Sequence, residues 1–386
     1  MSFFRRIFTA LLTLAMLLPA TGAARPLEEG TPMTLTSPAA VLVEAGTGAI
    51  IFEKNADEKR EVASITKLMT ALLVLEALER GDVQLTENVQ VSQKAAAMKG
   101  SQALLDANAT YSLEDLLRTT IMASANDSAV ALSEYLCGSE EAFVARMNAR
   151  AKDLGMEHTN YVNCTGYPQD GQYTTARDVA TLCCEVARHP RYTQYSSVWI
   201  DKLTYPGGRV TDLTNTNRLV RFYQGCDGFK TGSTDAAKYC LAATAEKNGM
   251  RLVAIVLGTP VSQTRFDEAR AMMDYGFANY QRVVIANKGD LLGESLPVHG
   301  GAADTVELAL GSGLSMLLKN GQQSGLKLEL SLPDYADAPV AQGDILGTVN
   351  VLLDGQVIAK LNCVAAADVP RPGFIEGLYR ILNNWR

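Results

Sequence analysis

The sequence predicts an α/β (α+β) protein with three parts: a large mixed domain, a small C-terminal all-β domain and a terminal amphipathic helix. Helix-like and strand-like runs alternate over residues 33–280. Short alternating runs separated by Gly and Asp occupy residues 283–367. Residues 371–386 carry their apolar side chains on one side of a helical wheel. We therefore expect two folded domains and a tail.

Composition limits the possible functions. The chain has 386 residues and a formal net charge of −7, with no basic block. This length suits two domains, and a mildly acidic surface makes nucleic acid an unsuitable partner. The seven cysteines include no Cys-x-x-Cys pair, so we expect neither a zinc site nor a disulfide scaffold. Adjacent Cys183 and Cys184 lie in an apolar helical pattern and are expected in the core.

The N-terminus is typical of a secretory signal peptide over residues 1–24. Arg5 and Arg6 form a positive region, Ile7–Leu18 is apolar, and Gly22–Ala24 supplies small residues for cleavage. The apolar run is short for a membrane span. A retained N-terminal anchor is the alternative.

The first elements of the mixed domain follow from turn and capping residues. Residues 39–55 predict a hairpin with Gly46 and Gly48 at its turn. The apolar run Ile65–Leu78 predicts a helix. Ser112 is the expected N-cap of the next helix, which should end near Met122.

The later elements are predicted in the same way. Asn126 or Asp127 is expected to cap a further helix, and Thr175 the helix after it. Asn248-Gly249 separates two strand-like runs and predicts a tight hairpin. A helix from Phe266 should pack on the sheet.

The tail has two possible interpretations. The apolar side of its helical wheel consists of Phe374, Ile375, Leu378, Tyr379, Ile381, Leu382 and Trp385. An amphipathic helix with an aromatic residue near its end suits a membrane interface. The alternative is a helix packed on the β domain or on another protein.

Three short motifs indicate acyl-transfer chemistry. Ser64-Ile65-Thr66-Lys67 places a hydroxyl and an amine three residues apart, and hence on one helix face. A serine becomes nucleophilic when a neighbouring base takes its proton, and a lysine of lowered basicity can be that base. Ser124-Ala125-Asn126 and Lys230-Thr231-Gly232 follow in order. We expect the second motif in an interhelical loop and the third on a sheet edge beside a cleft.

This trio resembles the motifs of penicillin-binding proteins and class A β-lactamases. The segments around Ser64 (VEAGTGAIIFEKNADEKREVASITKLMT), GMEHTNYVNCTG, DGQYTTARDVATL and DGFKTGSTDAAKYCLAATA resemble low-molecular-weight penicillin-binding proteins, the serine-type D-alanyl-D-alanine carboxypeptidases of peptidase family S11. The resemblance covers roughly residues 39–280. It implies a β-lactamase/transpeptidase-like catalytic domain, peptidoglycan stem peptides as substrates, β-lactams as inhibitors, and no metal or organic cofactor.

The resemblance also implies roles for single residues. Ser64 would be the nucleophile, Lys67 the base for acylation, and Ser124 a proton relay to the departing amine. Asn126 would hold Lys67 and the substrate amide.

The third motif would bind the free carboxylate of the peptide through Lys230 and Thr231. Gly232 would allow the substrate backbone to approach as an added strand. The backbone N–H groups of Ser64 and Ser233 would form the oxyanion hole. Arg265 stands where the family usually carries a carboxylate-binding arginine.

Two alternatives stay open at this point. A class A β-lactamase shares the motifs but needs a glutamate, usually in Glu-x-x-x-Asn; Glu157 is nearby, with Tyr161 where the Asn should be. A non-catalytic peptidoglycan-binding or β-lactam-sensing protein is the other. His158, His189 and His299 lie in no nucleophile elbow or His-x-x-x-His pair, which argues against Ser-His-Asp and zinc hydrolases.

The sequence as a whole predicts an exported D-alanyl-D-alanine carboxypeptidase. Its expected location is the extracytoplasmic face of the cytoplasmic membrane, held there by the terminal helix.

Overall fold

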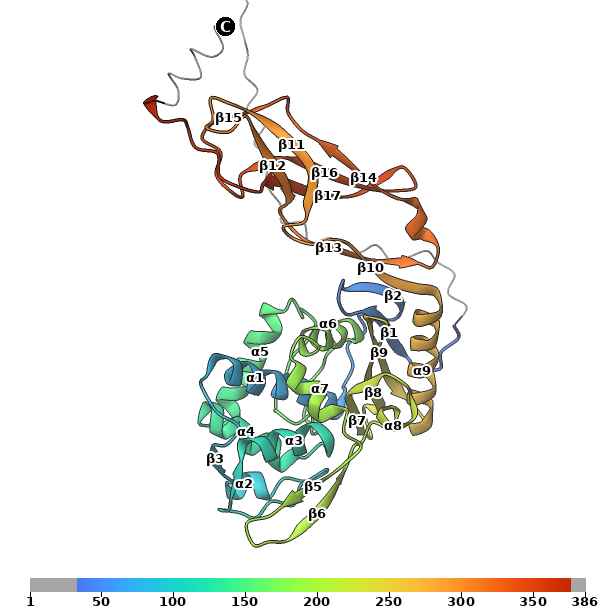
Figure 1. The fold of residues 1–386 in the computed structure, drawn as a ribbon. Helices are drawn as coiled ribbons and strands as arrows, with labels where there is room; N and C mark the ends of the chain where they lie inside the picture. Colours follow the sequence, from blue (N-terminus) through green and yellow to red (C-terminus); the bar gives the residue numbers. More distant parts are fainter. Residues whose placement is uncertain (1–32, 376–386) are drawn as a thin grey trace, which may run out of the picture.

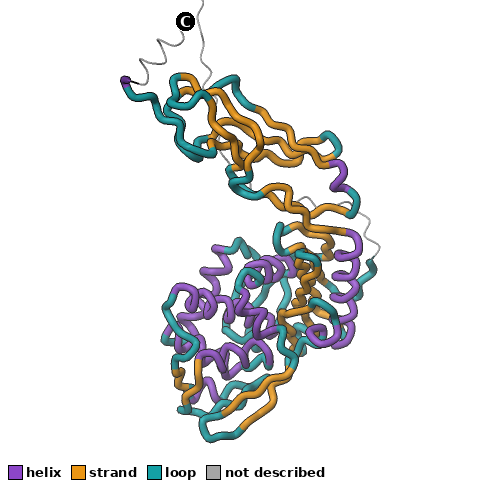
Figure 2. The backbone as a smooth tube through the Cα atoms, viewed as in Figure 1, coloured by secondary structure: helices purple, strands orange, loops and turns teal. Residues whose placement is uncertain are grey.

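The computed structural model describes residues 33–375 and consists of a mixed α/β domain with a β-rich domain stacked above it (Figure 1). Helices are confined almost entirely to the lower domain, and strands dominate the upper one (Figure 2). The mixed α/β domain and the C-terminal all-β domain of the predicted fold are therefore confirmed. Within the described residues, no helix has the length and apolar character needed to cross a bilayer. The predicted signal peptide, and the tail from residue 376 onward, lie outside the described residues.

A five-stranded antiparallel sheet forms the centre of the lower domain. Its strands, in spatial order, are β2 (Ala49–Lys54), β1 (Ala39–Glu44), β9 (Met250–Thr259), β8 (Lys238–Lys247) and β7 (Cys226–Thr234). Alternate residues of one strand enter different cores: Val41 and Val43 face the helical layer, whereas Ala40 and Leu42 face the opposite side. Because the sheet is buried on both faces, its three central strands, β1, β9 and β8, are apolar at most positions. Strand β7 lies at one edge.

The sheet is covered on both faces. Helix α9 (Ser262–Asn279) packs on one face, where Met272 and Met273 enter the core, and Figure 1 shows the sheet lying between it and the larger group of helices. The short α8 (Leu219–Phe222) joins this side. The helical layer on the opposite face comprises η1 (Ala63–Thr66), α1 (Lys67–Arg80), α2 (Gln93–Ala96), α3 (Leu113–Met122), α4 (Asn126–Cys137), α5 (Glu140–Asp153), α6 (Ala176–Val186) and α7 (Pro190–Ser196).

Helix α1 is the buried centre of that layer. Ten of its fourteen residues are buried, from Lys67 to Ala77, and it ends at Gly81 in the left-handed conformation. A helix enclosed on nearly all sides has little freedom to tilt or rotate. The residues at its N-terminal end, including Lys67, are therefore held in place by the core.

Two small hairpins complete the domain. One pairs β3 (Asn88–Gln90) with β4 (Thr110–Ser112), and the other pairs β5 (Ile200–Thr204) with β6 (Val210–Thr214). The predicted hairpins are also present, since β1 pairs with β2 and β8 with β9.

Most predicted caps are confirmed. Ser112 accepts a hydrogen bond from the backbone N–H of Asp115, and Thr175 accepts one from Asp178. The cap predicted at Asn126 or Asp127 is wrong, because Ala125 occupies the N-cap of α4 without a side-chain bond.

Asp127 has a different structural role. Its buried carboxylate accepts hydrogen bonds from the backbone N–H groups of Ala103 (2.9 Å), Leu105 (3.1 Å) and Ser128 (2.9 Å). It therefore ties the segment before β4 to the start of α4. Helix α9 starts at Ser262, four residues before the predicted Phe266.

The upper domain is all-β apart from one short 3-10 helix, η2 (Gln322–Gly325), between Tyr280 and Ala365. β10 (Tyr280–Ala286) pairs with β13 (Leu314–Lys319). The six-stranded sheet has the order β14 (Leu326–Ser331), β16 (Ile345–Leu353), β17 (Gln356–Ala365), β12 (Thr305–Leu310), β11 (Leu291–His299) and β15 (Ala336–Asp337).

The junction between the domains is apolar. Tyr280 of β10 and Leu317 of β13 belong to the same buried cluster as the inner face of α9. The β10–β13 pair thus packs on the lower domain while it leads into the upper one.

All seven cysteines are free. Cys183 is fully buried, as predicted for a core residue, whereas Cys184 is half-buried.

Candidate active site

Ser64 lies on η1, the single turn that leads into α1. Lys67 begins α1, and its Nζ lies 3.0 Å from Ser64 Oγ. The same Nζ donates to the backbone oxygen of Thr165 at 2.7 Å. The helix spacing expected from the sequence therefore brings an amine within hydrogen-bonding distance of the hydroxyl.

The environment of Lys67 makes its amine available as a base near neutral pH. The side chain is 1% exposed. Burial lowers the pKa of the Lys67 amine to about 7, although the neighbouring Cys164 and Asp127 favour its charged form. Near neutral pH a large fraction of this amine is unprotonated and able to accept a proton from Ser64 Oγ.

The second motif occupies the loop between α3 and α4, as predicted. Ser124 has φ +64° and is buried. Asn126 begins α4, and its Nδ2 donates to the backbone oxygen of Lys99 at 2.5 Å. Its Oδ1 is buried and has no hydrogen-bond partner among the described residues. A buried unpaired acceptor is costly unless a ligand satisfies it, so Asn126 can receive an amide N–H.

The third motif lies on the edge strand β7, also as predicted. Lys230 is buried, and its Nζ donates to the backbone oxygen of Thr231 at 3.2 Å. Burial lowers the pKa of Lys230 well below its usual value, and the positive charges of Lys67 and Arg265 lower it further. Thr231 Oγ1 donates to Thr216 Oγ1 at 2.7 Å.

Gly232 is the point at which β7 and η1 touch. A Cβ at this position would lie 2.3 Å from the backbone oxygen of Val62 and 3.1 Å from the backbone nitrogen of Ser64. Only glycine permits this approach. Ser233 follows and is exposed. The close contact places the Ser64 backbone N–H beside the strand that carries Ser233.

Arg265 lies on α9. Its Nη1 donates to the backbone oxygens of Gly232 (3.0 Å) and Cys240 (3.1 Å), and its Nη2 to Ser262 Oγ (3.3 Å). Burial lowers the pKa of the guanidinium to about 10. Arg265 thus holds the backbone of β7 at the motif glycine and adds a positive charge close to Lys230.

The structure brings the three motifs together from separate parts of the chain. Helices α3 and α4 both pack against α1, and η1 and α3 contact β7. Glu157, which the sequence analysis considered for the glutamate that a class A β-lactamase needs, is exposed.

The loop Asn163–Gly166 also belongs to the site, although the sequence did not identify it as a component. Asn163 Oδ1 accepts from the backbone N–H groups of Thr165 (3.2 Å) and Gly166 (2.7 Å). Gly166 has φ +78°, and a Cβ there would lie 1.9 Å from the backbone oxygen of Ala63. The loop therefore lies directly against η1 and presents the Thr165 carbonyl to Lys67.

Comparison with known proteins gives the same assignment. A family model described as D-alanyl-D-alanine carboxypeptidase matches residues 26–261. The chain belongs to this family. A second model, the C-terminal domain of penicillin-binding protein 5, matches residues 280–371. Carboxypeptidase is therefore its enzyme class, and a peptidoglycan substrate and penicillin binding fit the family.

Individual relatives are similar over almost the whole chain. D-alanyl-D-alanine carboxypeptidase DacF of Bacillus subtilis is 34% identical over 385 residues, or 99% of each chain. DacC of Escherichia coli is 32% identical over 86% of this chain and 84% of its own. The crystal structure of penicillin binding protein 5 from Haemophilus influenzae has a TM-score of 0.78 and 31% identity, covering 89% of this chain and all of that one.

Proposed function

We propose that this family member removes the terminal D-alanine from peptidoglycan stem pentapeptides through an acyl-enzyme at Ser64. The observation that carries the proposal is the 3.0 Å contact between Lys67 Nζ and Ser64 Oγ, made by a buried amine with a pKa of about 7.

In acylation, Ser64 Oγ attacks the carbonyl carbon of the penultimate D-alanine and its proton passes to Lys67 Nζ. Negative charge develops on the carbonyl oxygen. The backbone N–H groups of Ser64 and Ser233 are proposed to stabilise it, and the contact at Gly232 supports this arrangement. One such donor contributes roughly 100- to 1000-fold in rate.

The leaving group is the amine of the terminal D-alanine, which needs a proton as the C–N bond breaks. We assign its delivery to Ser124, which passes its hydroxyl proton to the amine and takes up in exchange the proton that Lys67 removed from Ser64. Lys230, when protonated, would favour this release. Water then hydrolyses the Ser64 ester, and Lys67 is again the base nearest to the ester oxygen.

Recognition of the peptide is assigned to the edge of β7. Thr231 Oγ1 offers a hydroxyl, and Arg265 provides a positive charge that attracts a free carboxylate. A bound carboxylate would in turn favour the protonated form of Lys230. The unpaired Oδ1 of Asn126 is proposed to accept the substrate amide N–H. The free edge of β7 allows the peptide backbone to add as a strand.

We further propose export and membrane attachment. The signal-like residues 1–24 would direct the chain out of the cytoplasm and into the compartment that contains peptidoglycan. The helix proposed for residues 371–386 would hold it at the extracytoplasmic membrane surface. The part of that segment that the structure describes supports this, since Phe374 is 89% exposed and Ile375 is 71% exposed. These residues lie at the end of the upper domain remote from the active site (Figure 1).

The test is incubation of the purified protein with a D-Ala-D-Ala pentapeptide, with and without benzylpenicillin. Stoichiometric D-alanine release that the drug abolishes is the expected result. Labelling by a fluorescent penicillin without D-alanine release would instead favour the non-catalytic binding protein. Rapid turnover of benzylpenicillin without peptide cleavage would favour the β-lactamase.

A further inference from the structure

Three helices of the lower domain bring two carboxylates and an imidazole together away from Ser64. Glu76 lies on α1, Glu185 on α6, and His189 directly before α7, with one ligand atom from each within 4.8 Å of the others. Glu76 follows Lys67 by nine residues on α1, or about 13 Å along the helix axis. The cluster therefore belongs to a different site.

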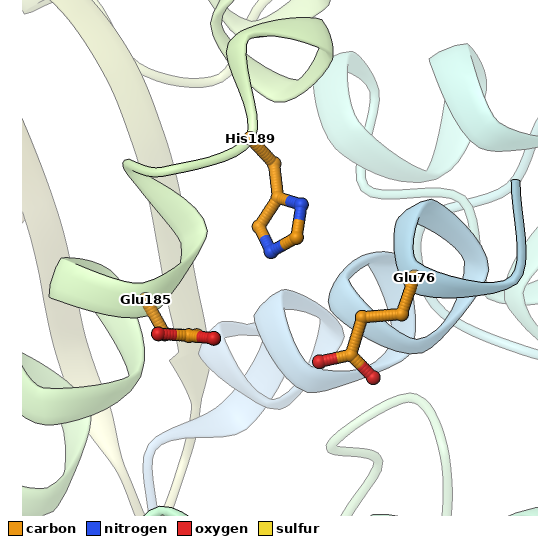
Figure 3. Close-up of side chains that lie close together, drawn as sticks. All are labelled: Glu76, Glu185 and His189. Atoms are coloured by element: carbon orange, nitrogen blue, oxygen red, sulfur yellow. The ribbon is translucent and has the colours of Figure 1, made fainter. Parts of the chain in front are cut away.

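The imidazole has one nitrogen in use and one free. His189 Nδ1 lies 2.7 Å from Glu79 Oε1, whereas Nε2 is buried and has no hydrogen-bond partner among the described residues. The whole side chain is 9% exposed. Figure 3 shows a ring nitrogen of His189 facing the gap between the Glu76 and Glu185 carboxylates. A histidine whose Nδ1–H donates to a carboxylate carries its lone pair on Nε2, the arrangement found in metal-ligating histidines.

The carboxylates are partly neutralised by arginine. Arg150 donates to Glu76 Oε1 through Nε (2.7 Å) and to Glu185 Oε1 through Nη2 (2.9 Å). Arg188 contacts Glu185 Oε2 at 3.1 Å but is 74% exposed, so solvent screens its charge. With Glu79, which contacts His189, the cluster contains three carboxylates and two guanidinium groups.

We propose that Glu76, Glu185 and His189 bind a divalent transition-metal ion, and that Zn²⁺ fits best. One imidazole nitrogen and two carboxylate oxygens are ligands that zinc accepts, with water in the fourth position. Because the three ligand atoms lie within 4.8 Å of one another, a central point exists that is at most about 2.8 Å from each of them. Zinc–ligand bonds are about 2.0–2.2 Å long, so each ligand atom would need to move by less than about 1 Å to bind the ion.

The neighbouring groups suit the outer shell of such a site. Glu79 would orient the His189 ring, and Arg150 would keep its bonds to the carboxylate oxygens that the metal leaves free. The ion would add a direct link between α1, α6 and the start of α7, which the Arg150 ion pairs and the His189–Glu79 contact already join. Its effect is to stabilise the folded domain, because it binds the native state and not the unfolded chain.

The experiment is titration of the chelator-treated, purified full chain with ZnCl₂ by calorimetry, combined with metal analysis after dialysis and thermal melts. We expect one saturable equivalent and a melting temperature that rises with zinc concentration. Glu76→Gln, Glu185→Gln and His189→Gln should each weaken this binding at least tenfold. Acylation by penicillin, which uses none of these residues, reports that each variant is folded.

Two matched controls separate this site from accidental zinc binding. His158→Gln removes another histidine of the same domain, and Cys184→Ser removes the thiol next to Glu185; both should bind zinc as the parent chain does. If His189→Gln fails to fold, zinc binding by Glu76→Gln is the deciding measurement. This variant should fold, because its amide oxygen can still accept the hydrogen bond from Arg150. Absence of saturable binding overturns the proposal and leaves an ion-pair network. Binding that survives the three ligand substitutions but is lost in Cys184→Ser also overturns it.

Discussion

Substitution of Gly232 by alanine tests whether contact between β7 and η1 sets the geometry of the site. The new Cβ would lie 2.3 Å from the backbone oxygen of Val62, whereas carbon and oxygen in contact are about 3.3–3.6 Å apart. Because the obstacle is backbone, β7 and η1 must separate by about 1 Å. A misplacement of this size at a catalytic centre costs about 100-fold in rate. The cost in stability should be about 1–3 kcal/mol, as for other overpacked sites.

The assay is the second-order rate of acylation by a fluorescent penicillin, with melting temperature measured in parallel. Gly207→Ala is the matched control, because a Cβ there meets nothing within 4 Å. The control should acylate at the parent rate, and Gly232→Ala about 100-fold more slowly while still folded. If Gly232→Ala acylates within a few-fold of the parent rate, close packing of β7 on η1 does not position the nucleophile.

Three further predictions concern the base Lys67, the C-terminal tail and the buried carboxylate of Asp127. The acylation rate should be level above pH 7 and fall about tenfold per unit below it, because protonated Lys67 cannot accept the Ser64 proton; a flat profile from pH 5 to 9, or a Lys67→Ala variant with the parent rate, would identify another base. Deleting residues 371–386 should abolish co-sedimentation with anionic vesicles and leave hydrolysis of small peptides unchanged, whereas equal binding by both forms would favour the packed-helix alternative. Asp127→Ala should lower the urea midpoint strongly, since three buried N–H groups lose their acceptor at about 1–3 kcal/mol each; Asp127→Asn, which retains one oxygen, should lower it less.

The residues that could be predicted from the sequence are those whose side-chain type carries the chemistry. The spacing of Ser64 and Lys67 predicts the contact found at 3.0 Å, because helix geometry brings positions i and i+3 together. The two later motifs were needed to mark this common spacing as catalytic. The β8–β9 hairpin was predictable for a similar local reason: Asn248 and Gly249 adopt φ of +52° and +74°, which few other residues tolerate.

What escaped prediction depends on contacts between residues that lie far apart in the sequence. The Thr165 carbonyl accepts from Lys67, but a backbone oxygen leaves no signature in sequence. The cap of α4 was misplaced because Asp127 satisfies distant backbone N–H groups rather than those of its own helix. The cluster joins Glu76 to Glu185 and His189, which lie more than a hundred positions later in the chain, so no short motif marks all three.

The most direct test of the central claim is to locate the acyl group. The purified chain is treated with benzylpenicillin, digested and mapped by mass spectrometry, with Ser64→Ala treated in the same way. The adduct should lie on the peptide that contains Ser64, and the variant should carry none and release no D-alanine from pentapeptide. Stable labelling of Ser64→Ala, or an adduct on a peptide without Ser64, would contradict the assignment of the nucleophile.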